Sequence, residues 1–533
     1  MEFDTVVIGS GAGGLAAALC LAREGQKVLV LEQHYVAGGW CHTFSRNKSK
    51  FTPGIHYIGL LAEGESSNDL YKGLGIANDL TFYRMNPDGF EHCWIGNERF
   101  DIPAGMDAFK EKLISKFPHE AKGIERYFKT VNDVSRELQL IPKLHGFWNK
   151  VFIPYKTRHL GKYGLFSLQR VINWHVKDPL LQKILNVQCG DHGLPPEKVS
   201  FPLHAAVMEH YLSGGYYPKG GGESIVHAMV NVIKQYNGEI WTKKKVKQIL
   251  LKDQTKRQAI GVMLEDGTKI YAKNIISNAD PHKTYRDLLP REILSGKLNQ
   301  KLDNTQYSCS SLLLFLTVDM DVKSLGLDSG NIWIMPNEDM DRVYNEMMQE
   351  NLLAEEYFSG LFISCTTLKD PSSFNGKHHT FEVVTFINNK SFEAFQNEKK
   401  KRSFKYKMLK EKLMKKMIKS LDRVLPGVKE HIVYKDLGTP LTNEYYINAT
   451  RGSVYGTEKT FKQIGPNAFR AVSEIKNLYL CGASILAHGV TGATYSGVEA
   501  AAQVLNCRQD DLIKPLAGQK ITILESEKGY KYV

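Results

Sequence analysis

The sequence predicts a two-domain α/β protein with a Rossmann-type dinucleotide-binding domain and an inserted α+β domain. The chain has 533 residues, which is too long for one ordinary hydrophobic core. Its N-terminus reads as strand, glycine turn, helix and second strand within about thirty residues. Elements of the same kind recur in the middle and at the end, with other material inserted twice between them. The nucleotide-binding domain is therefore expected to be discontinuous.

The first motif is "FDTVVIGSGAGGLAAALCLAREGQKVLVLEQ". Gly9, Gly11 and Gly14 form G-x-G-x-x-G between strand and helix, where a tight turn brings backbone N–H groups to a pyrophosphate. Glu32 ends the second strand, where its carboxylate can accept hydrogen bonds from both ribose hydroxyls. Because that acid would repel a 2′-phosphate, the pattern favours FAD or NAD over NADP. The Gly38-Gly39 pair then favours FAD, because a second loop must approach the longer cofactor.

The remaining elements follow in chain order. We expect helices over 105–135 and in the basic, aromatic stretch 143–195, and a glycine turn opening an amphipathic helix over 214–237. A β-meander is expected over 238–280, with a hairpin at Asp266-Gly267, followed by strands within 306–390. A basic helix over 398–424 and a closing strand, glycine loop and helix over 477–505 complete the chain. These elements predict a nucleotide-binding domain from 1–100, 212–290 and 432–510, a second domain from 101–211 and 291–431, and a tail over 511–533.

Composition places the chain among ordinary proteins of a reducing compartment. It is 42% hydrophobic and 24% charged, and no apolar run approaches the roughly 18–20 residues that span a bilayer. The eight cysteines contain no C-x-x-C pair, which argues against a zinc ribbon or a disulfide framework. The N-terminus enters a strand at once and shows no signal peptide. We therefore expect a cytoplasmic protein, peripheral at most at the inner face of a membrane.

The net charge of +12 comes mainly from two segments. Residues 399–419 hold eleven Lys/Arg and one acid, and residues 143–178 hold seven and one. In 143–178 the basic residues alternate with aromatic and aliphatic ones, as in an interfacial segment, so we expect this segment to contact a membrane. For 399–419 we favour a solvated helix face. Nucleic acid is not expected as a partner, because no recognition module accompanies the charge.

The whole chain resembles the phytoene desaturase and carotenoid isomerase superfamily of FAD-dependent oxidoreductases, most closely its retinol saturase branch. The resemblance rests on "LEQHYVAGGWCHTF", "PGIHYIG", "YYPKGGGESI", "IISNADPHKTYRDLLP" and "NLYLCGASILAHGVTGATYSGVEAA". It implies that FAD is lined by Gly9, Ser10, Gly11, Ala12, Gly13, Gly14, Glu32, Gln33, Gly38, Gly39, Val246, Gly482, Gly489, Val490 and Thr491. The chain departs from many relatives at Trp40, where they carry Arg or Lys, and at Ala483, where some carry an acid.

Cys41 and His42 follow the second glycine pair and raise the question of a metal or a reactive thiol. Two ligands fall short of a tetrahedral site, and a nucleophilic thiol would need an activating base and an acyl-type substrate. We therefore expect no metal and expect both residues to pack around the cofactor loop.

Reduction of an alkene by a flavin requires a hydride and a proton, and several side chains are candidates for the proton. His56 and Tyr57 lie in a loop returning toward the cofactor, and His56 either donates the proton or only anchors the loop. Glu209, His210 and Tyr211 re-enter the core, and His488 lies in the terminal loop. An enzyme can also act on a polyene mainly by positioning it, with the flavin as the sole redox agent and no single side chain dominating the proton transfer.

The resemblance implies an enzyme that acts on C=C bonds of a hydrophobic isoprenoid or polyene. Saturation of a retinol-like substrate is the first expectation, with NAD(P)H as an external electron donor. A carotenoid desaturase or cis–trans isomerase on the same scaffold is the nearest alternative. A flavin-binding lipid carrier without turnover is an alternative of another class.

Overall fold

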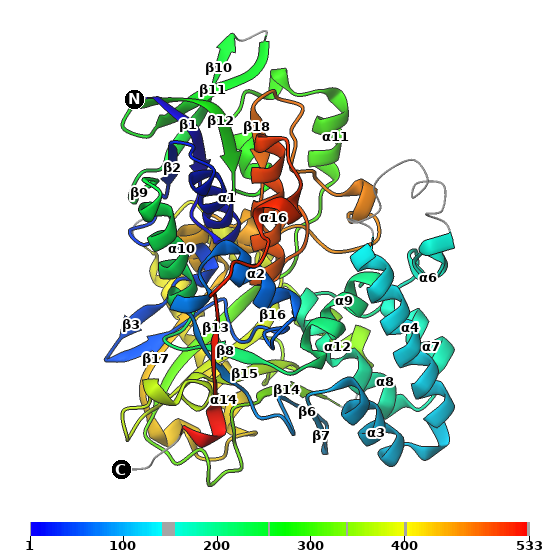
Figure 1. Ribbon diagram of the computed structural model, residues 1–533. Coiled ribbons are helices and arrows are strands. Elements are labelled where there is room, and N and C mark those ends of the chain that lie inside the picture. Colours follow the sequence, from blue (N-terminus) through cyan, green and yellow to red (C-terminus); the bar gives the residue numbers. More distant parts are fainter. Residues whose placement is uncertain (1, 141–154, 254–255, 337–338, 399–401, 530–533) are drawn as a thin grey trace.

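The computed structural model describes residues 2–140, 155–253, 256–336, 339–398 and 402–529, and two large sheets organise them (Figure 1). The first sheet lies in the upper half of Figure 1, near the N-terminus, and the second lies below it. A group of helices stands beside the second sheet, on the right of the view.

The first sheet has a parallel core flanked by an antiparallel meander. Its order is β10-β11-β12-β1-β2-β9, and β18 pairs with β12. The strands are β1 (Glu2–Ile8), β2 (Val28–Leu31), β9 (Glu239–Trp241), β10 (Val246–Asp253), β11 (Lys256–Leu264), β12 (Lys269–Ser277) and β18 (Leu478–Leu480). The pairs β1–β2, β1–β12, β2–β9 and β12–β18 are parallel. Continuous apolar runs such as that of β2 suit strands covered on both faces.

Three helices pack on this sheet as one hydrophobic cluster: α1 (Ala12–Arg23), α10 (Glu223–Gln235) and α16 (Gly489–Leu505). The α1 and α16 backbones approach so closely that a Cβ on Gly497 would overlap the Gly13 carbonyl. Small residues are therefore required where the first and last helices of the chain meet. This contact brings the closing loop of the chain to the N-terminal glycine turn.

The second sheet is mostly antiparallel and has the order β17-β13-β16-β15-β14-β6-β7. Its strands are β6 (Glu91–Ile95), β7 (Glu98–Ile102), β13 (Ser310–Val318), β14 (Asn331–Met335), β15 (Leu361–Cys365), β16 (His379–Ile387) and β17 (Ile432–Gly438). Alternate side chains of β13 separate its two faces: Leu312, Leu314 and Leu316 join one cluster with α14 (Phe404–Asp422), whereas Leu313 and Phe315 belong to another.

The helices beside this sheet enclose the largest hydrophobic cluster. They are α3 (Met106–Lys116), α4 (Ala121–Leu140), α6 (Arg158–Tyr163), α7 (Leu168–His175), α8 (Pro179–Asn186), α9 (Phe201–Leu212) and α12 (Met340–Met347). The further elements are β3 (Phe44–Arg46), β4 (Ser49–Phe51), β5 (Thr81–Arg84), β8 (Tyr216–Pro218), β19 (Thr522–Glu525), α2 (Ser66–Leu74), α11 (Gly296–Asn304), α13 (Thr366–Lys369), α15 (Pro440–Ile447) and α17 (Gln509–Leu512).

Most expected elements are confirmed, including the N-terminal βαβ unit, the meander with its turn at Gly267 (φ +85°), the basic helix and the closing strand and helix. The expected helical stretch 143–195 is confirmed from residue 155 onward, and its part at 141–154 lies outside the described residues. Two predicted domain boundaries need correction. Three strands, β6, β7 and β17, fall in or at the predicted nucleotide-binding segments but belong to the second sheet. There β6 pairs with β14 and β7, and β17 pairs with β13.

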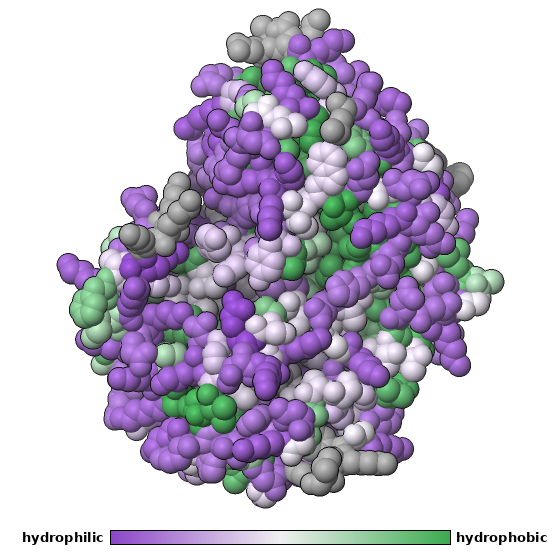
Figure 2. Space-filling model, turned by 90° about the vertical axis from the view of Figure 1, so that its left-hand side faces the viewer, coloured by the Kyte–Doolittle hydropathy of each residue, from purple (hydrophilic) through white to green (hydrophobic). Residues whose placement is uncertain are grey.

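The surface agrees with the composition. The face in Figure 2 is mainly hydrophilic, with smaller hydrophobic patches between the polar side chains. Over the described parts of the chain, no helix has both the length and the hydrophobicity that crossing a bilayer requires. All eight cysteines are free thiols.

Candidate active site

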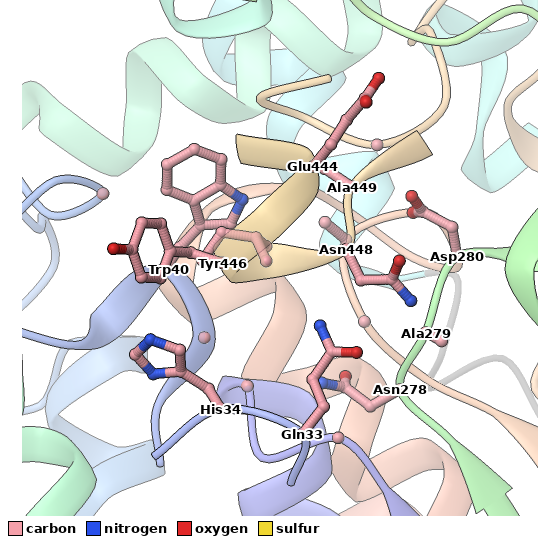
Figure 3. Close-up of a pocket in the computed structure, with 18 of the residues that line it drawn as sticks. Gln33, His34, Trp40, Asn278, Ala279, Asp280, Glu444, Tyr446, Asn448 and Ala449 are labelled. Carbon is pink, nitrogen blue, oxygen red and sulfur yellow. The ribbon is translucent and has the colours of Figure 1, made fainter. Parts of the chain in front are cut away.

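One cavity of about 1380 Å³ lies between the two sheets. Its lining begins at the glycine turn and Glu32 and extends to Trp333, Phe362 and Phe386 of the second sheet. Pockets for a single small ligand usually have about 300–1000 Å³, so this cavity has room for a cofactor and a substrate together. Figure 3 shows the part where Gln33 and Asn278 face Asn448 and Ala449 across the cavity.

The glycine turn is held in shape by the acid that follows β2. Glu32 Oε2 accepts hydrogen bonds from Ser10 N (3.0 Å) and Ser10 Oγ (2.5 Å), and Oε1 accepts one from His34 N (2.8 Å). The turn leads into α1, whose first turn holds no acidic residue. The helix N-terminus therefore presents free backbone donors and a positive dipole end, which suit a phosphate.

The second glycine pair packs directly on the first turn. Gly38 N donates to Ser10 O (3.1 Å) and Ser10 Oγ (3.1 Å), and Gly38 bridges to Gly11. Both Gly38 (φ +124°) and Gly39 (φ +55°) have backbone conformations that favour glycine. A Cβ on Gly39 would lie 3.1 Å from Gly11 Cα. Two glycine loops thus form one wall of the cavity.

Most of the residues expected at the cofactor do line the cavity: Gly9, Ser10, Gly11, Ala12, Gly13, Glu32, Gln33, Gly39, Val246, Gly482, Gly489 and Val490. Gly14, Gly38 and Thr491 stand behind this lining. A Cβ on Gly14 would overlap the Gly9 carbonyl oxygen, so Gly14 allows α1 to approach the strand. Thr491 Oγ1 lies 3.4 Å from Ser67 Oγ.

Asn278 is a site residue that the motif analysis quoted without assigning a role. It follows β12 and lines the cavity, where its N donates to Ile8 O (2.8 Å). A Cβ on Gly11 would lie 2.7 Å from Asn278 Nδ2, so the Asn278 amide packs directly against the glycine turn. The cradle at the turn, the carboxylate of Glu32 and the length of the cavity together fit a dinucleotide such as FAD.

The Trp-Cys-His segment has the packing role that we expected. Burial raises the pKa of Cys41 to about 12, so this thiol is protonated at neutral pH and is no nucleophile. His42 Nδ1 lies 2.6 Å from Gly39 O. Within the described ranges, no three His, Cys, Asp or Glu side chains are arranged to hold a metal ion. Trp40 lines the cavity near Tyr446 and His34 (Figure 3).

His56 lines the cavity and belongs to a buried charged network. Its Nδ1 lies 3.1 Å from Glu382 Oε2, outside the geometry of a hydrogen bond. Lys369 Nζ donates to His56 O (2.7 Å), Ser364 Oγ (2.7 Å) and Asn331 Oδ1. Burial lowers the pKa of Lys369 to about 7. The backbone of the loop is thus anchored by Lys369, while its imidazole faces the cavity.

Tyr57 also lines the cavity, and its hydroxyl meets two carboxylates. It lies 2.5 Å from Glu91 Oε1 and 2.9 Å from Asp191 Oδ2. The Tyr57 ring stacks on Tyr211, with centroids 4.1 Å apart. Sequence reasoning missed Glu91, Asp191, Lys369 and Glu382, because they come from distant elements and no local motif marks them.

The two other histidine candidates lie outside the cavity lining. His210 Nε2 accepts a hydrogen bond from Gly59 N (3.0 Å), and burial lowers its pKa to about 4. His488 packs against His192 and Tyr455, and burial lowers its pKa to about 3. Both rings are neutral near pH 7 and stabilise the walls. Glu209 accepts a hydrogen bond from Gln139 Nε2 (3.0 Å).

The fold and the cavity define an α/β protein with a Rossmann-like nucleotide-binding domain. Residues 7–74 match the family of NAD(P)-binding Rossmann-like domains. A solved structure of a putrescine oxidase variant shares the fold with a TM-score of 0.65 and 14% identity, covering 95% of this chain and 99% of the other.

The more particular assignment comes from relatives in sequence. The all-trans-retinol 13,14-reductase of Danio rerio is 33% identical over 95% of this chain and 86% of its own length. The chain belongs to the all-trans-retinol 13,14-reductase family, which confirms the resemblance to the saturase branch. An inactive all-trans-retinol 13,14-reductase of Danio rerio is 27% identical, covering 98% and 90%. Prolycopene isomerase 1 of an Oncidium hybrid cultivar is 27% identical, covering 94% and 84%.

Proposed function

We propose that this protein is an FAD-dependent oxidoreductase that reduces a C=C bond of a hydrophobic polyene, with a retinol-like isoprenoid as its substrate. One observation carries the proposal: a single cavity joins the glycine turn and Glu32 to the apolar wall of the second sheet. Bound FAD would supply the hydride, and NAD(P)H would return the electrons to it.

The chain's own residues would bind the two molecules at opposite ends. Backbone N–H groups at the start of α1 would bind phosphates, and Glu32 would accept hydrogen bonds from a ribose. The other end is lined by Leu313, Trp333, Phe362, Val384 and Phe386. Such a wall suits an apolar polyene, because each Å² of apolar surface removed from water contributes about 25 cal/mol.

The proposal is tested with purified holoprotein under anaerobic conditions. The flavin is reduced chemically, and all-trans-retinol, lycopene isomers or phytoene are then added separately. Reoxidation of the flavin with loss of polyene absorbance supports reduction of the substrate. NAD(P)H replaces the chemical reductant in a second series, and no flavin reduction there removes NAD(P)H as the donor. Protein without a flavin absorption spectrum would contradict the cofactor assignment.

The same experiment separates the other functions that the family relationship favours. A change of isomer at constant redox state supports an isomerase, as the name of the Oncidium relative suggests. Flavin reduction by phytoene supports a desaturase. Polyene binding without any redox change supports a carrier, an alternative in keeping with the inactive Danio rerio relative.

Membrane contact through the segment 143–178 is a separate part of the proposal. Its described portion exposes Tyr155, Leu165 and Trp174 by 72, 75 and 44%. Arg170 stacks over the Phe166 and Trp174 rings, and Lys162 over Tyr163. Exposed apolar side chains next to basic ones are suited to binding a surface of anionic lipid. Lys150 of the same segment lies outside the described residues.

Flotation with anionic liposomes tests this contact. Each basic residue near an anionic surface contributes about 1 kcal/mol, so neutralising Lys156, Arg158 and Lys162 together should strongly reduce flotation. Neutralising three lysines of α14, Lys405, Lys407 and Lys412, is the matched control. Equal loss in both variants, or none in the first, would contradict the assignment to 143–178.

A further inference from the structure

A shared proton lies at the cavity wall, between two carboxylates and one phenol. The Tyr57 hydroxyl has one hydrogen, but its oxygen lies within hydrogen-bond distance of both Glu91 (2.5 Å) and Asp191 (2.9 Å). If both carboxylates were ionised, the hydroxyl could donate to only one of them. The other would face an oxygen lone pair inside the protein, which is strongly unfavourable. The geometry therefore requires a second hydrogen, held by one of the carboxyl groups.

The surroundings of the two carboxyl groups are unequal. Glu91 on β6 is fully buried and accepts hydrogen bonds from three donors: the Tyr57 hydroxyl, Trp333 Nε1 (3.1 Å) and Gln188 Nε2 (3.2 Å). Among the described residues, Tyr57 is the only hydrogen-bond partner of the Asp191 carboxyl. Donors stabilise the ionised form, so Glu91 is the anion and Asp191 is the neutral acid. The order is Asp191 O–H to Tyr57 oxygen, and Tyr57 O–H to Glu91.

Burial and the nearby negative charge of Glu91 both raise the pKa of Asp191. Burial, followed by the nearby Glu91 charge, raises the pKa of Asp191 well above its usual value. The other titratable groups that face this cluster are Cys93 of β6, Cys189 of η5, Tyr211 of α9, Tyr344 of α12, Tyr455 and His488 from the C-terminal segment, and Lys369 of α13. The two cysteines, the three tyrosines and His488 are neutral near pH 7, and Lys369 lies on the Glu91 side.

The protein backbone places Asp191 at the cavity. It lies in the 3₁₀ helix η5 (Val187–His192) and lines the cavity, as Tyr57 and Trp333 do. A Cβ on the preceding Gly190 would overlap the Trp333 ring, so only glycine lets η5 lie against this wall. Tyr455 Oη donates to Gly190 O (3.1 Å), which fixes the same turn. The neutral acid therefore reaches the side of the cavity that is lined by apolar residues.

We propose that Asp191 is the general acid that protonates the polyene, and that Tyr57 and Glu91 are positioning residues that keep it protonated. The inference rests on the proposed reductase function. Bound reduced flavin would supply a hydride to one alkene carbon, and the Asp191 carboxyl would give its proton to the neighbouring carbon. The step would balance, because the C=C π bond is lost, two C–H bonds form, the flavin gives up two electrons with the hydride, and Asp191 becomes a carboxylate. Water entering after product release returns the proton.

The first test measures the proton itself, in holoprotein without substrate. Infrared titration should show a protonated carboxyl that persists well above pH 6 and disappears in Asp191→Asn. Asp341→Asn is the matched control: Asp341 lies on α12, outside the cavity lining, and its pKa is raised by burial to about 6. This control should remove only a band that titrates near pH 6. Loss of the persistent band in the control, or its survival in Asp191→Asn, overturns the assignment.

The second test measures delivery of the proton in single turnovers of the reduced holoprotein with all-trans-retinol. Asp191→Asn should slow double-bond reduction by about 10²–10⁴-fold, and Asp191→Glu should restore part of the rate. Turnover in D₂O should be slower for the wild type but not for Asp191→Asn. The rate should fall as pH rises through the pKa of Asp191, and Glu91→Gln should move that fall to lower pH by removing the adjacent negative charge.

The outcomes separate the two proposals. Wild-type rates in Asp191→Asn overturn proton delivery and leave the reductase function standing. A higher KM for retinol but not for lycopene, at unchanged turnover, also overturns it and assigns Asp191 to binding the alcohol. A wild-type protein that reduces no polyene removes the reductase function and the delivery step together. In that case the infrared band still reports whether the proton is present.

Discussion

The two ends of the cavity handle polar groups in opposite ways. At the nucleotide end, Ser10 and His34 hold the Glu32 carboxylate through contacts within one βαβ unit. At the second-sheet end, the polar network is assembled from elements hundreds of residues apart, such as Lys369 and the His56 loop. The first end depends on backbone shape and the second on burial of titratable groups. Substitutions should therefore act through geometry at one end and through charge at the other.

The largest effect should come from Lys369→Met. Removing one partner from a buried charged network costs about 3–5 kcal/mol, because His56 O, Ser364 and Asn331 lose their shared donor. Urea unfolding measures the loss. Lys405→Met on the exposed side of α14 is the control and should change stability by less than about 0.5 kcal/mol. Equal losses of stability in the two variants would contradict the role given to buried charge at the second-sheet end.

The same variant should also change how the free energy of unfolding depends on pH. The folded-state pKa of Lys369 is about 7, below its usual 10.5, so between these values the unfolded chain binds a proton that the folded chain has released. Stability from this group therefore rises with pH across that window and is lost as pH falls toward 7. Lys369→Met should lack this rise in urea unfolding measured from pH 7 to 10.

Gly14→Ala should have the next largest effect and should act at the nucleotide end. The added Cβ overlaps the Gly9 carbonyl oxygen, and overpacking of this kind costs about 1–3 kcal/mol. The turn would shift, so the purified variant should lose most of its flavin absorbance. Gly25→Ala is the control: its φ of +81° is strained, but no atom lies within 4 Å of the added Cβ. Flavin retained by Gly14→Ala would show that the turn tolerates displacement.

Glu32→Gln should weaken cofactor binding and leave the fold intact. The amide presents a donor where Ser10 or His34 already donates, and a hydrogen bond to a charged group contributes about 1.5–3 kcal/mol. We expect a fall in FAD affinity of about 10- to 100-fold, measured by fluorescence titration of the apoprotein. Glu24→Gln, at the exposed end of α1, should bind FAD as the wild type does. Unchanged affinity would remove Glu32 from the cofactor site.

His210→Gln should have the smallest effect on stability at neutral pH and should change stability only in acid. The pKa of His210 is lowered from 6.5 to about 4 by burial, so below pH 6.5 the unfolded chain binds a proton that the folded chain excludes. Stability from this group is complete above pH 6.5 and falls as pH decreases toward 4, by up to about 1.4 kcal/mol per pH unit. Glutamine can still accept from Gly59 N and should flatten this dependence in unfolding measured from pH 4 to 7.

The nucleotide end could be predicted because its features are local. Gly9, Gly11, Gly14 and Glu32 have the spacing of a βαβ unit, and the Gly38-Gly39 pair follows it closely. In the structure Gly9, Gly11, Glu32 and Gly39 line one wall, with Gly14 and Gly38 directly behind it. The domain boundaries were less accurate at β6, β7 and β17. A strand's own sequence shows that it is a strand, but its hydrogen-bond partner depends on chain segments far away.

The proton-handling groups could not be predicted from the sequence. His56 and Tyr57 were candidates because they lie near a motif, and the structure places both at the cavity. It also brings Asp191 of η5 into the cavity lining. Glu91 of β6 lies beside Tyr57, and Glu382 of β16 and Lys369 of α13 lie beside His56. Each reads in the sequence as an ordinary charged residue. Burial changes their chemistry, and burial is known only when the second sheet and the helices beside it are in place.

The sequence by itself therefore determined the nucleotide-binding unit, its favoured cofactor class and the family of the chain, because glycine spacing and strand periodicity are properties of neighbouring residues. Only the tertiary structure decided which carboxyl group stays protonated. That choice depends on how many hydrogen-bond donors each carboxylate meets, and those donors come from separate elements of the chain.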